Sequence, residues 1–367
     1  MPGPYDLSQE QLAALPALAD QPDFRARQVW DGLYRRALPL ADLTDLPRAL
    51  RDRLTADPAL QPALSTAVRL VADGSQTVKW GWTLHDGATI ETVLMHYPDR
   101  STVCVSTQAG CAMACSFCAT GQAGFTRHLT TGEIVEQVVA AIAEARPRRV
   151  ANVVFMGMGE PLANYAPMWG AVERMHGDLG FSARHLTVST VGLVPGIRRL
   201  AKEALPVNLA VSLHAANDAL RNQLVPINKR WPLAALIAAC HEYRATKGRR
   251  LSFEWALIDG VNDRPSDADQ LADLARPLGA HVNLIPLNPT PGYRTRGTAG
   301  NEVRAFRDLL VAQGVNATVR RNRGTDIDAA CGQLAGTVAG TVAGAMSGAG
   351  AGQSVVMRPL PRSRVPN

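Results

Sequence analysis

Apolar residues recur at helical spacing through the first 60 residues, between proline breaks that limit each stretch. The pattern predicts short helices in QEQLAAL after a Ser8 N-cap, in DFRARQVWDGLYRR and in PRALRDRL. The second stretch combines an apolar stripe with several arginines. We therefore predict a small helical accessory domain over residues 1–60, whose basic face is either an RNA contact or a solvated helix surface.

From about residue 65, apolar residues recur at every second position, which indicates strands. The runs VRLVA, TVKWGWTL and ATIETVLMHY are separated by DG pairs at Asp73-Gly74 and Asp86-Gly87, a turn signal typical of hairpins. Residues 61–97 are therefore predicted to form a β-meander that connects the helical domain to the rest of the chain.

Strand-like and helical runs alternate from residue 101 onward. The strand-like runs are TVCVST, ANVVF, HLTVST, PVNLAVSL, LSFEWAL, AHVNLIPL and NATVR, and the helical runs include IVEQVVAAIAEA, LAALIAACHEY and VRAFRDLLVAQ. This alternation is typical of a parallel sheet, either open or curved into a barrel, with functional residues in the loops that follow the strands. We predict an α/β core over residues 98–333.

The last part of the chain has a different composition. No charged residue lies between Cys331 and Arg358, and Gly and Ala are frequent there. Glycines repeat at GxxxG spacing in this stretch, but it is too weakly hydrophobic for a membrane helix. We predict a flexible tail over residues 334–367 and no interaction with a membrane.

Composition and charge narrow the class of protein. The 367 residues carry 38 Lys and Arg against 32 Asp and Glu, and the formal net charge of +6 favours a polyanionic partner such as RNA. Short basic clusters occur at Arg198-Arg199, Lys229-Arg230, Lys247 to Arg250, Arg294-Arg296 and Arg320 to Arg323. The start MPGPYDLSQEQ has neither region of a signal peptide, so we expect a cytoplasmic protein.

Three of the six cysteines, Cys111, Cys115 and Cys118, lie within eight residues, directly after the run TVCVST. A cubane iron–sulfur cluster takes one ligand per iron, so three thiolates leave one iron open. The spacing CxxxCxxC resembles that of the radical S-adenosylmethionine superfamily, which implies a [4Fe-4S] cluster and S-adenosylmethionine as cofactors. The alternative is zinc bound by these thiols and His128.

Small and polar residues follow several later strands. The segment NVVFMGMGEPLAN resembles the GGEP motif of the same superfamily, with Gly159 permitting close backbone approach and Glu160 able to face an ammonium group. The other candidate cofactor-binding residues at strand ends are Ser189, Ser212, Leu213, His214 and Asn288. Each is ordinary as a turn residue, so the prediction rests on their repetition around one rim.

Two further cysteines and a glutamate complete a more specific pattern. The segments ETVLM, CVSTQAGCAMACSFC, MGMGEPL, SLHA, NLIPLNP and RGTDIDAACGQL together resemble the RlmN/Cfr family of RNA adenine methyltransferases, from about residue 20 to 335. The resemblance implies a partial (β/α)6-type radical S-adenosylmethionine barrel. It assigns catalytic roles to Glu91, Cys104 and Cys331, whereas Cys240 lies in an apolar helical run and is predicted to be core.

The resemblance also implies a reaction that uses two S-adenosylmethionine molecules per turnover. Carbon 2 of adenine is electron-poor and cannot attack an electrophilic methyl group, so the Cys331 thiolate takes the methyl group first. A radical from the second cofactor molecule then removes hydrogen from this methyl group, and the carbon radical adds to the base. Glu91 removes the proton from carbon 2, and Cys104 attacks the Cys331 sulfur, which forms a transient disulfide.

Strand alternation supports the assignment of Glu91 independently. In TIETVLM it lies on one face with Val93 and Met95, where burial would raise its pKa toward a useful range for a base. The alternative for this residue is a surface carboxylate on an edge strand.

The substrates that the resemblance implies are an adenosine near the peptidyl-transferase centre of 23S rRNA and the adenosine beside the anticodon in some tRNAs. A target base must leave its stack to reach a buried cluster. We expect a monomer that receives electrons from a donor such as flavodoxin or ferredoxin. The alternatives are a Cfr-like enzyme that methylates carbon 8 with the same cysteines, and a zinc-stabilised RNA-binding protein without catalysis.

Overall fold

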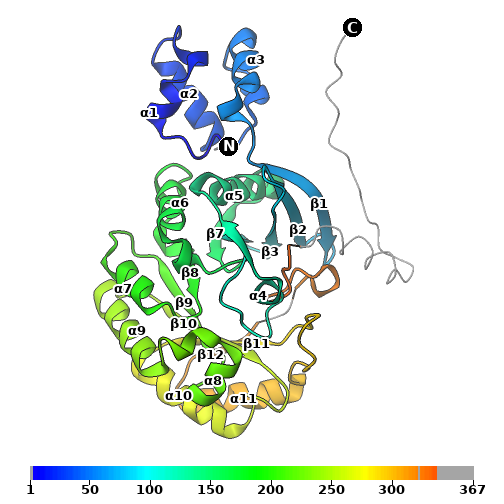
Figure 1. Cartoon of the computed structure of the whole chain (residues 1–367), viewed down its shortest axis with the longest axis vertical. Helices are drawn as coiled ribbons and strands as arrows, with labels where there is room; N and C mark the ends of the chain where they lie inside the picture. Colours follow the sequence, from blue (N-terminus) through cyan, green and yellow to red (C-terminus); the bar gives the residue numbers. More distant parts are fainter. Residues whose placement is uncertain (1–2, 321–322, 337–367) are drawn as a thin grey trace, which may run out of the picture.

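A mixed β-sheet forms the centre of the molecule in the computed structural model, which describes residues 3–320 and 323–336 (Figure 1). The strands in this part of the chain are β1 (Leu64–Ala72), β2 (Thr77–Leu84), β3 (Thr89–His96), β4 (Ser101–Cys104), β5 (Gln108–Gly110), β6 (Phe125–His128), β7 (Val150–Phe155), β8 (Leu186–Thr190), β9 (Asn208–Ser212), β10 (Leu251–Leu257), β11 (His281–Pro286) and β12 (Ala317–Val319).

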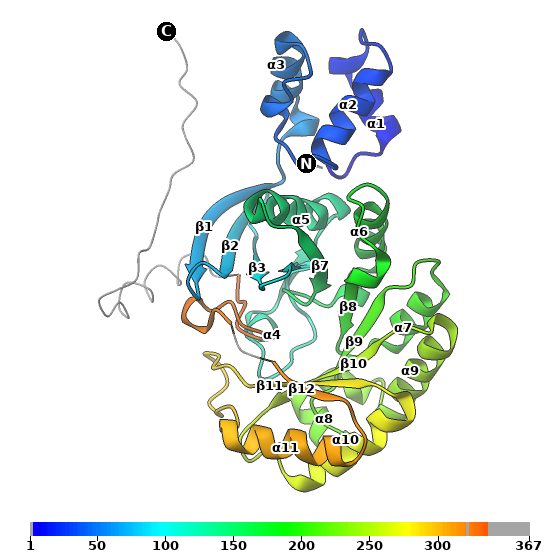
Figure 2. The ribbon, with the colours of Figure 1, turned by 180° about the vertical axis from the view of Figure 1, so that it is seen from behind.

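The sheet changes from antiparallel to parallel pairing at β4. Its strand order is β1-β2-β3-β4-β7-β8-β9-β10-β11-β12, in which β1 to β4 pair antiparallel and each later neighbour pairs parallel. The predicted meander therefore extends the parallel sheet at one edge. The predicted α/β class with a parallel sheet is confirmed, and the sheet curves without closing (Figure 2).

Helices cover the outer side of the curve, where the apolar strand residues need a second layer (Figures 1 and 2). The helices of the described chain are α1 (Gln9–Ala13), α2 (Phe24–Leu33), α3 (Arg48–Ala56), α4 (Ala119–Ala123), α5 (Thr131–Ala145), α6 (Tyr165–Gly177), α7 (Val194–Lys202), α8 (Asp218–Leu224), α9 (Leu233–Lys247), α10 (Pro265–Leu278) and α11 (Gly300–Ala312). Short 3-10 helices are η1 (Pro16–Leu18), η2 (Leu40–Asp42), η3 (Pro58–Leu60), η4 (Pro161–Asn164), η5 (Ala183–His185), η6 (Pro226–Lys229) and η7 (Thr325–Ile327). On the inner side of the curve lie α4, the cysteine loop and the last described segment (Figures 1 and 2).

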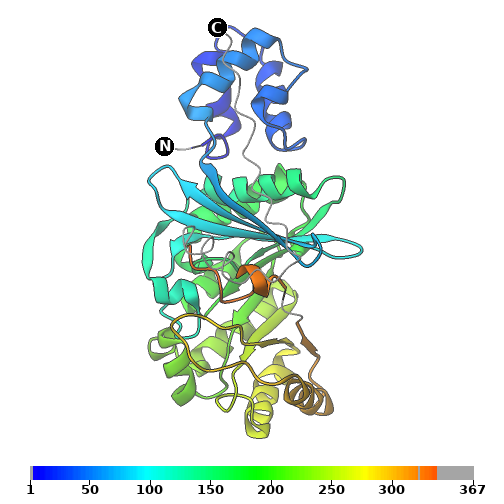
Figure 3. The ribbon, with the colours of Figure 1, turned by 90° about the vertical axis from the view of Figure 1, so that its right-hand side faces the viewer.

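The predicted N-terminal helices form, and they lie above α5 and α6 in the view of Figure 1 (see also Figure 3). Ser8 caps α1 through a capping box, as its sequence predicts. The Trp30 indole donates to Asp178 at the end of α6 (3.0 Å), and Asp6 accepts from the Gly132 N–H in the first turn of α5 (2.7 Å). These polar contacts, together with buried apolar residues, hold the helical group on the α/β core.

The predicted division at residues 60, 97 and 333 stays a prediction. The predicted tail over 334–367 lies almost wholly outside the described residues, which end at Gly336. Among the described residues, no helix is both long enough and apolar enough to cross a membrane.

The central strand β9 offers a direct test of the core. Leu209 is 1% exposed between β8 and β10, whereas Leu309 on α11 is 38% exposed. We expect Leu209→Ala to lower the free energy of unfolding by about 2–5 kcal/mol, since it leaves a cavity in a packed core. Leu309→Ala should change it by less than about 0.5 kcal/mol. Denaturant unfolding followed by circular dichroism measures both, and equal losses would contradict the assigned burial.

Candidate active site

The carboxyl ends of the parallel strands open onto one cavity, as expected for this class of fold. Eleven of the thirteen predicted site residues line it: Cys104, Cys111, Cys115, Cys118, Gly159, Glu160, Ser189, Ser212, His214, Asn288 and Cys331. The other two lie elsewhere. The Leu213 side chain is fully buried in the core, and Glu91 is buried behind the segment that carries Cys331.

The cysteine loop runs between β5 and β6, which pair as a short antiparallel ribbon. Backbone hydrogen bonds fix its shape: the Cys111 N–H donates to the Gly124 carbonyl (2.7 Å), and the Cys118 N–H donates to the Cys115 carbonyl (3.2 Å). Cys115 is 7% exposed, and the other two thiols are half-buried. The loop thus presents three thiols to the cavity from a braced backbone.

The thiols of this loop suit a metal cluster. Burial raises the pKa of Cys111 to about 12 and that of Cys115 well above its usual range, and the neighbouring thiols add to both shifts. Three thiolates can share this dry wall only if a cation offsets their charge, because metal binding requires deprotonated thiols and stabilises them.

The spacing of these sulfur atoms also bears on the metal. Within the described residues, the one group of three candidate ligands whose atoms all lie within 4.8 Å of one another is Asp259, Asp263 and Glu302, so the cysteine sulfurs are more widely spaced. Tetrahedral zinc with bonds of about 2.3 Å would bring its sulfurs within about 3.8 Å of one another. His128, the fourth ligand in the zinc alternative, is exposed on β6 and contacts Gln108. The donor set therefore fits an iron–sulfur cube better than zinc.

The glycines after β7 allow a close crossing of two chain segments. A Cβ atom on Gly157 would lie 2.7 Å from the Val105 carbonyl oxygen. At Gly159, which has φ of +97°, it would lie 2.5 Å from the Gln108 Cβ atom. Glycine is the residue that fits both positions. The crossing brings the GMGE segment against the loop that follows β4 and leaves its backbone on the cavity wall.

Glu160 ties two rim loops together. Its carboxylate accepts hydrogen bonds from the Leu162 N–H (3.0 Å) and the Val191 N–H (2.8 Å), so the loops after β7 and β8 share one anchor. Burial raises the pKa of Glu160 to about 7. A carboxylate on the cavity wall would favour a bound ammonium group, which fits the predicted role of this residue.

His214 follows β9 in a left-handed backbone conformation, with φ of +59°. Its Nδ1 atom accepts a hydrogen bond from the Ala256 N–H (2.9 Å), and burial lowers its pKa to about 3. The ring is therefore neutral, and its proton is on Nε2. The ring also packs edge-on against Phe117 of the cysteine loop, with centroids 4.8 Å apart. His214 thus offers a hydrogen-bond donor to a ligand in the cavity.

A fully buried arginine, which the sequence did not single out, braces this rim. Arg221 on α8 donates to the carbonyls of Leu213 (3.0 Å) and Val191 (2.6 Å) and to the Asn228 side chain (2.7 Å). It therefore connects the chain after β8 with the chain after β9. The RNQLVPINK segment contains no periodic or motif signal that distinguishes this arginine from a surface residue.

Cys104 and Cys331 line the same cavity although they lie more than 200 residues apart in the sequence. Cys104 ends β4 and is half-buried, whereas Cys331 is exposed in the segment 323–336 that lies across the open side of the sheet (Figure 3). Burial raises the pKa of Cys104 to about 12, nearby Cys331 adds to this rise, and Arg320 opposes it. All six cysteines are free thiols, so the structure gives no support to the transient disulfide that the resemblance implies.

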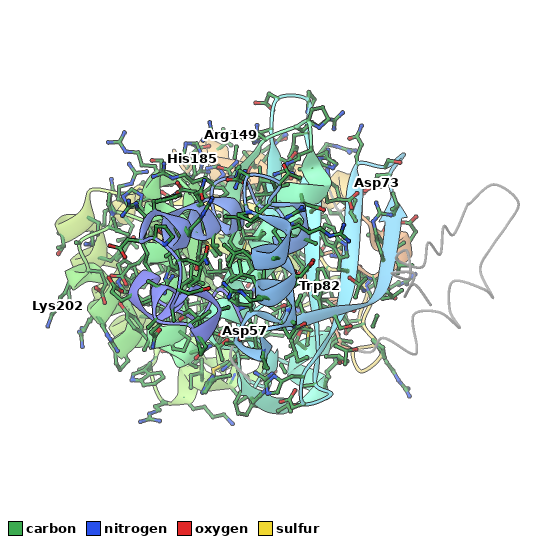
Figure 4. The ribbon with its side chains drawn as sticks, turned by 90° about the horizontal axis from the view of Figure 1, so that it is seen from above. Asp57, Asp73, Trp82, Arg149, His185 and Lys202 are labelled. Carbon is green, nitrogen blue, oxygen red and sulfur yellow. The ribbon has the colours of Figure 1, made fainter. Side chains whose placement is uncertain are left out.

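Hydrogen bonds hold the Cys331 segment to the cavity. The Asn288 side chain donates to the Cys331 carbonyl (3.0 Å), and the Ala119 N–H, directly after the cysteine loop, donates to the Gly332 carbonyl (2.8 Å). At the start of the segment, the Gly324 N–H donates to the Asp73 carboxylate (3.0 Å). Asp73 lies at the outer edge of the sheet, where Figure 4 labels it. Cys331 is thereby attached both to the cluster loop and to the meander.

Two charged residues of the cavity, Arg320 and Glu254, were not among the predicted site residues. Arg320 lies 3.5 Å from Glu254, and the Oε2 atom of Glu254 is buried without a hydrogen bond among the described residues. Behind the Cys331 segment, the Lys79 ammonium group lies 2.9 Å from the Glu91 carboxylate. Lys79 did carry a sequence signal, since it is a lone charge in the apolar run TVKWGWTL.

Comparisons with known proteins show the family to which the chain belongs. Residues 105–275 match the family model described as the radical SAM superfamily. The chain is 54% identical to a probable dual-specificity RNA methyltransferase RlmN of Parafrankia sp. (strain EAN1pec), over 90% of each chain. It is 51% identical to the protein of that name in Chloroflexus aurantiacus, over 90% of this chain and 92% of that one. The crystal structure of a radical SAM methyltransferase from Sphaerobacter thermophilus is 49% identical, with a TM-score of 0.87 over 92% of this chain and 100% of that one.

The cysteines of the loop can be tested by metal content. Cys115→Ala removes a ligand from the cavity wall, so after anaerobic reconstitution we expect a large loss of bound iron and sulfide and of the brown absorbance. Cys240→Ala is the matched control, because Cys240 is fully buried in the core away from the cavity. Retention of the full iron content by the Cys115 variant, or binding of one zinc by the unaltered chain, would exclude this ligand set.

Proposed function

The chain belongs to the RlmN family of radical SAM RNA methyltransferases, and we propose that it methylates carbon 2 of adenosine in 23S rRNA and in tRNA. The observation that carries this proposal is that one cavity is lined by two sets of thiols, namely Cys104 with Cys331 and the three cysteines of the loop. The family consists of enzymes, so the alternative of a non-catalytic zinc protein is set aside.

The chemistry of the base explains why a carrier cysteine is useful. Carbon 2 of adenine lies between two ring nitrogens and is too electron-poor to attack an electrophilic methyl group. A thiolate attacks the same methyl group readily, so Cys331 is proposed to hold the methyl group first. Its exposure supports this role, because it can reach a methyl donor without rearrangement of the core.

The proposed cofactors fit the residues described above. The thiols of Cys111, Cys115 and Cys118 would hold a [4Fe-4S] cluster, and the rim residues at Gly159, Glu160, Ser189, Ser212, His214 and Asn288 would hold S-adenosylmethionine. Leu213 would contribute only backbone, since its side chain is in the core. When bound, these groups supply the methyl group and a hydrogen-abstracting radical. We propose two S-adenosylmethionine molecules per turnover, because the methyl group and the radical come from different bonds of the cofactor.

Glu91 and Cys104 are proposed to release the product from a Cys331–CH2–adenine adduct. The radical adduct must first pass one electron to an acceptor, a role that the proposed iron–sulfur cluster would serve. The C2–H bond then breaks, its electron pair stays with the ring and Glu91 takes the proton. The Cys104 thiolate then attacks the Cys331 sulfur: an S–S bond forms, the S–CH2 bond breaks, and its electron pair and a proton complete the methyl group. A thiol reductant must supply two electrons to restore both cysteines.

The position of the cavity limits the form of the substrate. It lies inside the curve of the sheet, so a base must leave its stack to reach it, which favours looped or locally opened RNA. The net charge of +6 supports binding of RNA. We propose that the protein acts as a monomer in the cytoplasm, with flavodoxin or ferredoxin as its electron donor.

An RNA assay tests the proposed reaction and separates it from methylation at carbon 8. The reconstituted protein is incubated with ribosomal RNA and with tRNA, each with S-adenosylmethionine and reductant, and digested products are mapped by mass spectrometry. We expect 2-methyladenosine from both RNAs, and none with Cys331→Ala because the methyl carrier is missing. An 8-methyladenosine product would replace the proposed regiochemistry with that of the Cfr-like alternative.

The role of Cys104 can be tested by trapping. With Cys104→Ala, methyl transfer to Cys331 and radical addition can proceed, but nothing displaces the Cys331 sulfur, so a covalent protein–RNA adduct should accumulate. Denaturing gel electrophoresis with labelled RNA detects it. Cys240→Ala should form no adduct and should turn over normally, and normal turnover by Cys104→Ala would remove that residue from the mechanism.

A further inference from the structure

A buried ion pair joins the meander to the proposed base. Lys79 on β2 and Glu91 on the adjacent strand β3 lie 2.9 Å apart, Nζ to Oε1, with side chains only 1% and 3% exposed. Removing two charges from water costs several kcal/mol per ion, and a buried pair is often no more stabilising than apolar residues of the same size. Stability alone therefore gives no reason for a lysine in an otherwise apolar strand.

Each partner of this pair also contacts the segment that carries Cys331. The Lys79 ammonium group donates to the Asp328 carbonyl (3.0 Å), three residues before Cys331, and the Glu91 Oε2 atom accepts from the Ala335 N–H (3.2 Å), four residues after it. The two contacts lie on either side of Cys331. A displacement of this segment would therefore break both of them together and leave the ion pair as the remaining contact of each side chain.

We propose that Lys79 is a positioning residue that couples the Cys331 segment to Glu91, holding Glu91 as a carboxylate aimed at the segment while Cys331 is closed over the cavity. The proposal rests on the proposed role of Glu91 as the base. In that role, the C2–H bond breaks, its electron pair stays with the adenine ring and the proton moves to the carboxylate. A carboxylate that is already protonated cannot take it, so the charge of Lys79 matters at this step.

Among the groups around Glu91, Lys79 is the one whose charge keeps the carboxyl ionised. Burial raises the pKa of Glu91, whereas the charge and hydrogen bond of Lys79 lower it. The other groups that act on the carboxyl are the N–H groups of Ala335 and Gly336 in the segment. The polar side chains that contact β3 here are neutral: Ser106, in the loop after β4, donates to the Glu91 carbonyl, and Gln137 on α5 binds Ser106 and Thr92. Glu133 and Glu136 on α5 are not among the groups that shift the pKa of Glu91.

The coupling requires both features of the lysine. A neutral side chain at position 79 could still donate to the Asp328 carbonyl, but it could not hold Glu91 ionised in a buried environment. A protonated Glu91 would present one hydroxyl and one neutral carbonyl oxygen in place of two charged oxygens, so its hydrogen bond from the Ala335 N–H would weaken. The expected defect is therefore in product release, while methylation of Cys331, which needs neither group, continues.

Lys79→Gln separates the charge from the hydrogen bond and is the primary variant. Reconstituted enzyme is assayed for methyl on Cys331 by peptide mass spectrometry and for RNA product against pH. We expect methyl on Cys331 within about twofold of the unaltered enzyme, accumulation of adduct, and an acidic limb of the product profile that moves to higher pH. Each unit of that shift lowers the rate about tenfold on the acidic limb. Lys79→Arg should restore the limb.

Three further variants complete the test. Lys202→Met is the matched control, an exposed lysine on α7 remote from the meander (Figure 4), and should match the unaltered enzyme. Lys79→Met removes both the charge and the hydrogen-bond donor. It should move the acidic limb as far as Lys79→Gln does, and it should also loosen the Cys331 segment, which would be detected as faster proteolysis near Cys331. Glu91→Gln should accumulate adduct at every pH.

The outcomes separate the two proposals. A pH profile of Lys79→Gln that matches the unaltered enzyme, while Glu91→Gln traps adduct, overturns the coupling and leaves the proposed function intact. Loss of Cys331 methylation in both Lys79→Gln and Lys79→Met also overturns it, because the lysine would then serve the fold. Normal product formation by Glu91→Gln removes the base itself and the coupling with it.

Discussion

The return of residues 323–336 across the open side of the sheet is the constraint on which the whole site depends. Without this return, Cys331 would lie near neither Cys104 nor the cysteine loop. The segment is held by hydrogen bonds to Asp73, Lys79, Thr89, Glu91, Ala119, Thr120 and Asn288. Each of these hydrogen bonds stabilises the closed position by about 1 kcal/mol, which is no more than the entropic cost of fixing the backbone of one residue. The closed position is therefore held by a modest margin, as suits a segment whose cysteine must meet both a methyl donor and a base.

Buried positive charge is the second requirement of this cavity. Its wall combines thiols, whose pKa values burial raises, with the carboxyls of Glu160 and Glu254. Arg221 and Arg320 lie beside these groups, and Arg221 is satisfied by backbone carbonyls instead of by a carboxylate. Such an arginine braces the rim and retains its charge for the cavity. It also joins the rim loops after β8 and β9, because it donates to the carbonyls of both Val191 and Leu213.

The sequence predicted most of the architecture and the ligand set, for identifiable reasons. Strand runs from TVCVST to NATVR and turn pairs such as Asp73-Gly74 are local signals, and the cysteine spacing is a motif. Helices α6, α7 and α10 were not singled out, since glycine or proline interrupts each of them. Arg221 was missed, and Arg320 was named only as part of a basic cluster, because their places at the site arise from tertiary contacts that no local pattern encodes.

The order of exposure in the site matches the order of the proposed steps. Cys331 is exposed, Cys104 is half-buried and Glu91 is 2% exposed. A group that must meet a separate cofactor molecule has to be reachable, whereas a base that acts only on an adduct already in place gains from a dry environment, where its charge is less screened. The Cys331 segment covers Glu91 through the Ala335 N–H. Glu91 therefore becomes available to the adduct when its carboxylate releases the Ala335 N–H and turns to the C2–H group. The segment that carries Cys331, on which the first step takes place, thus also controls access to the base that acts near the end of the reaction.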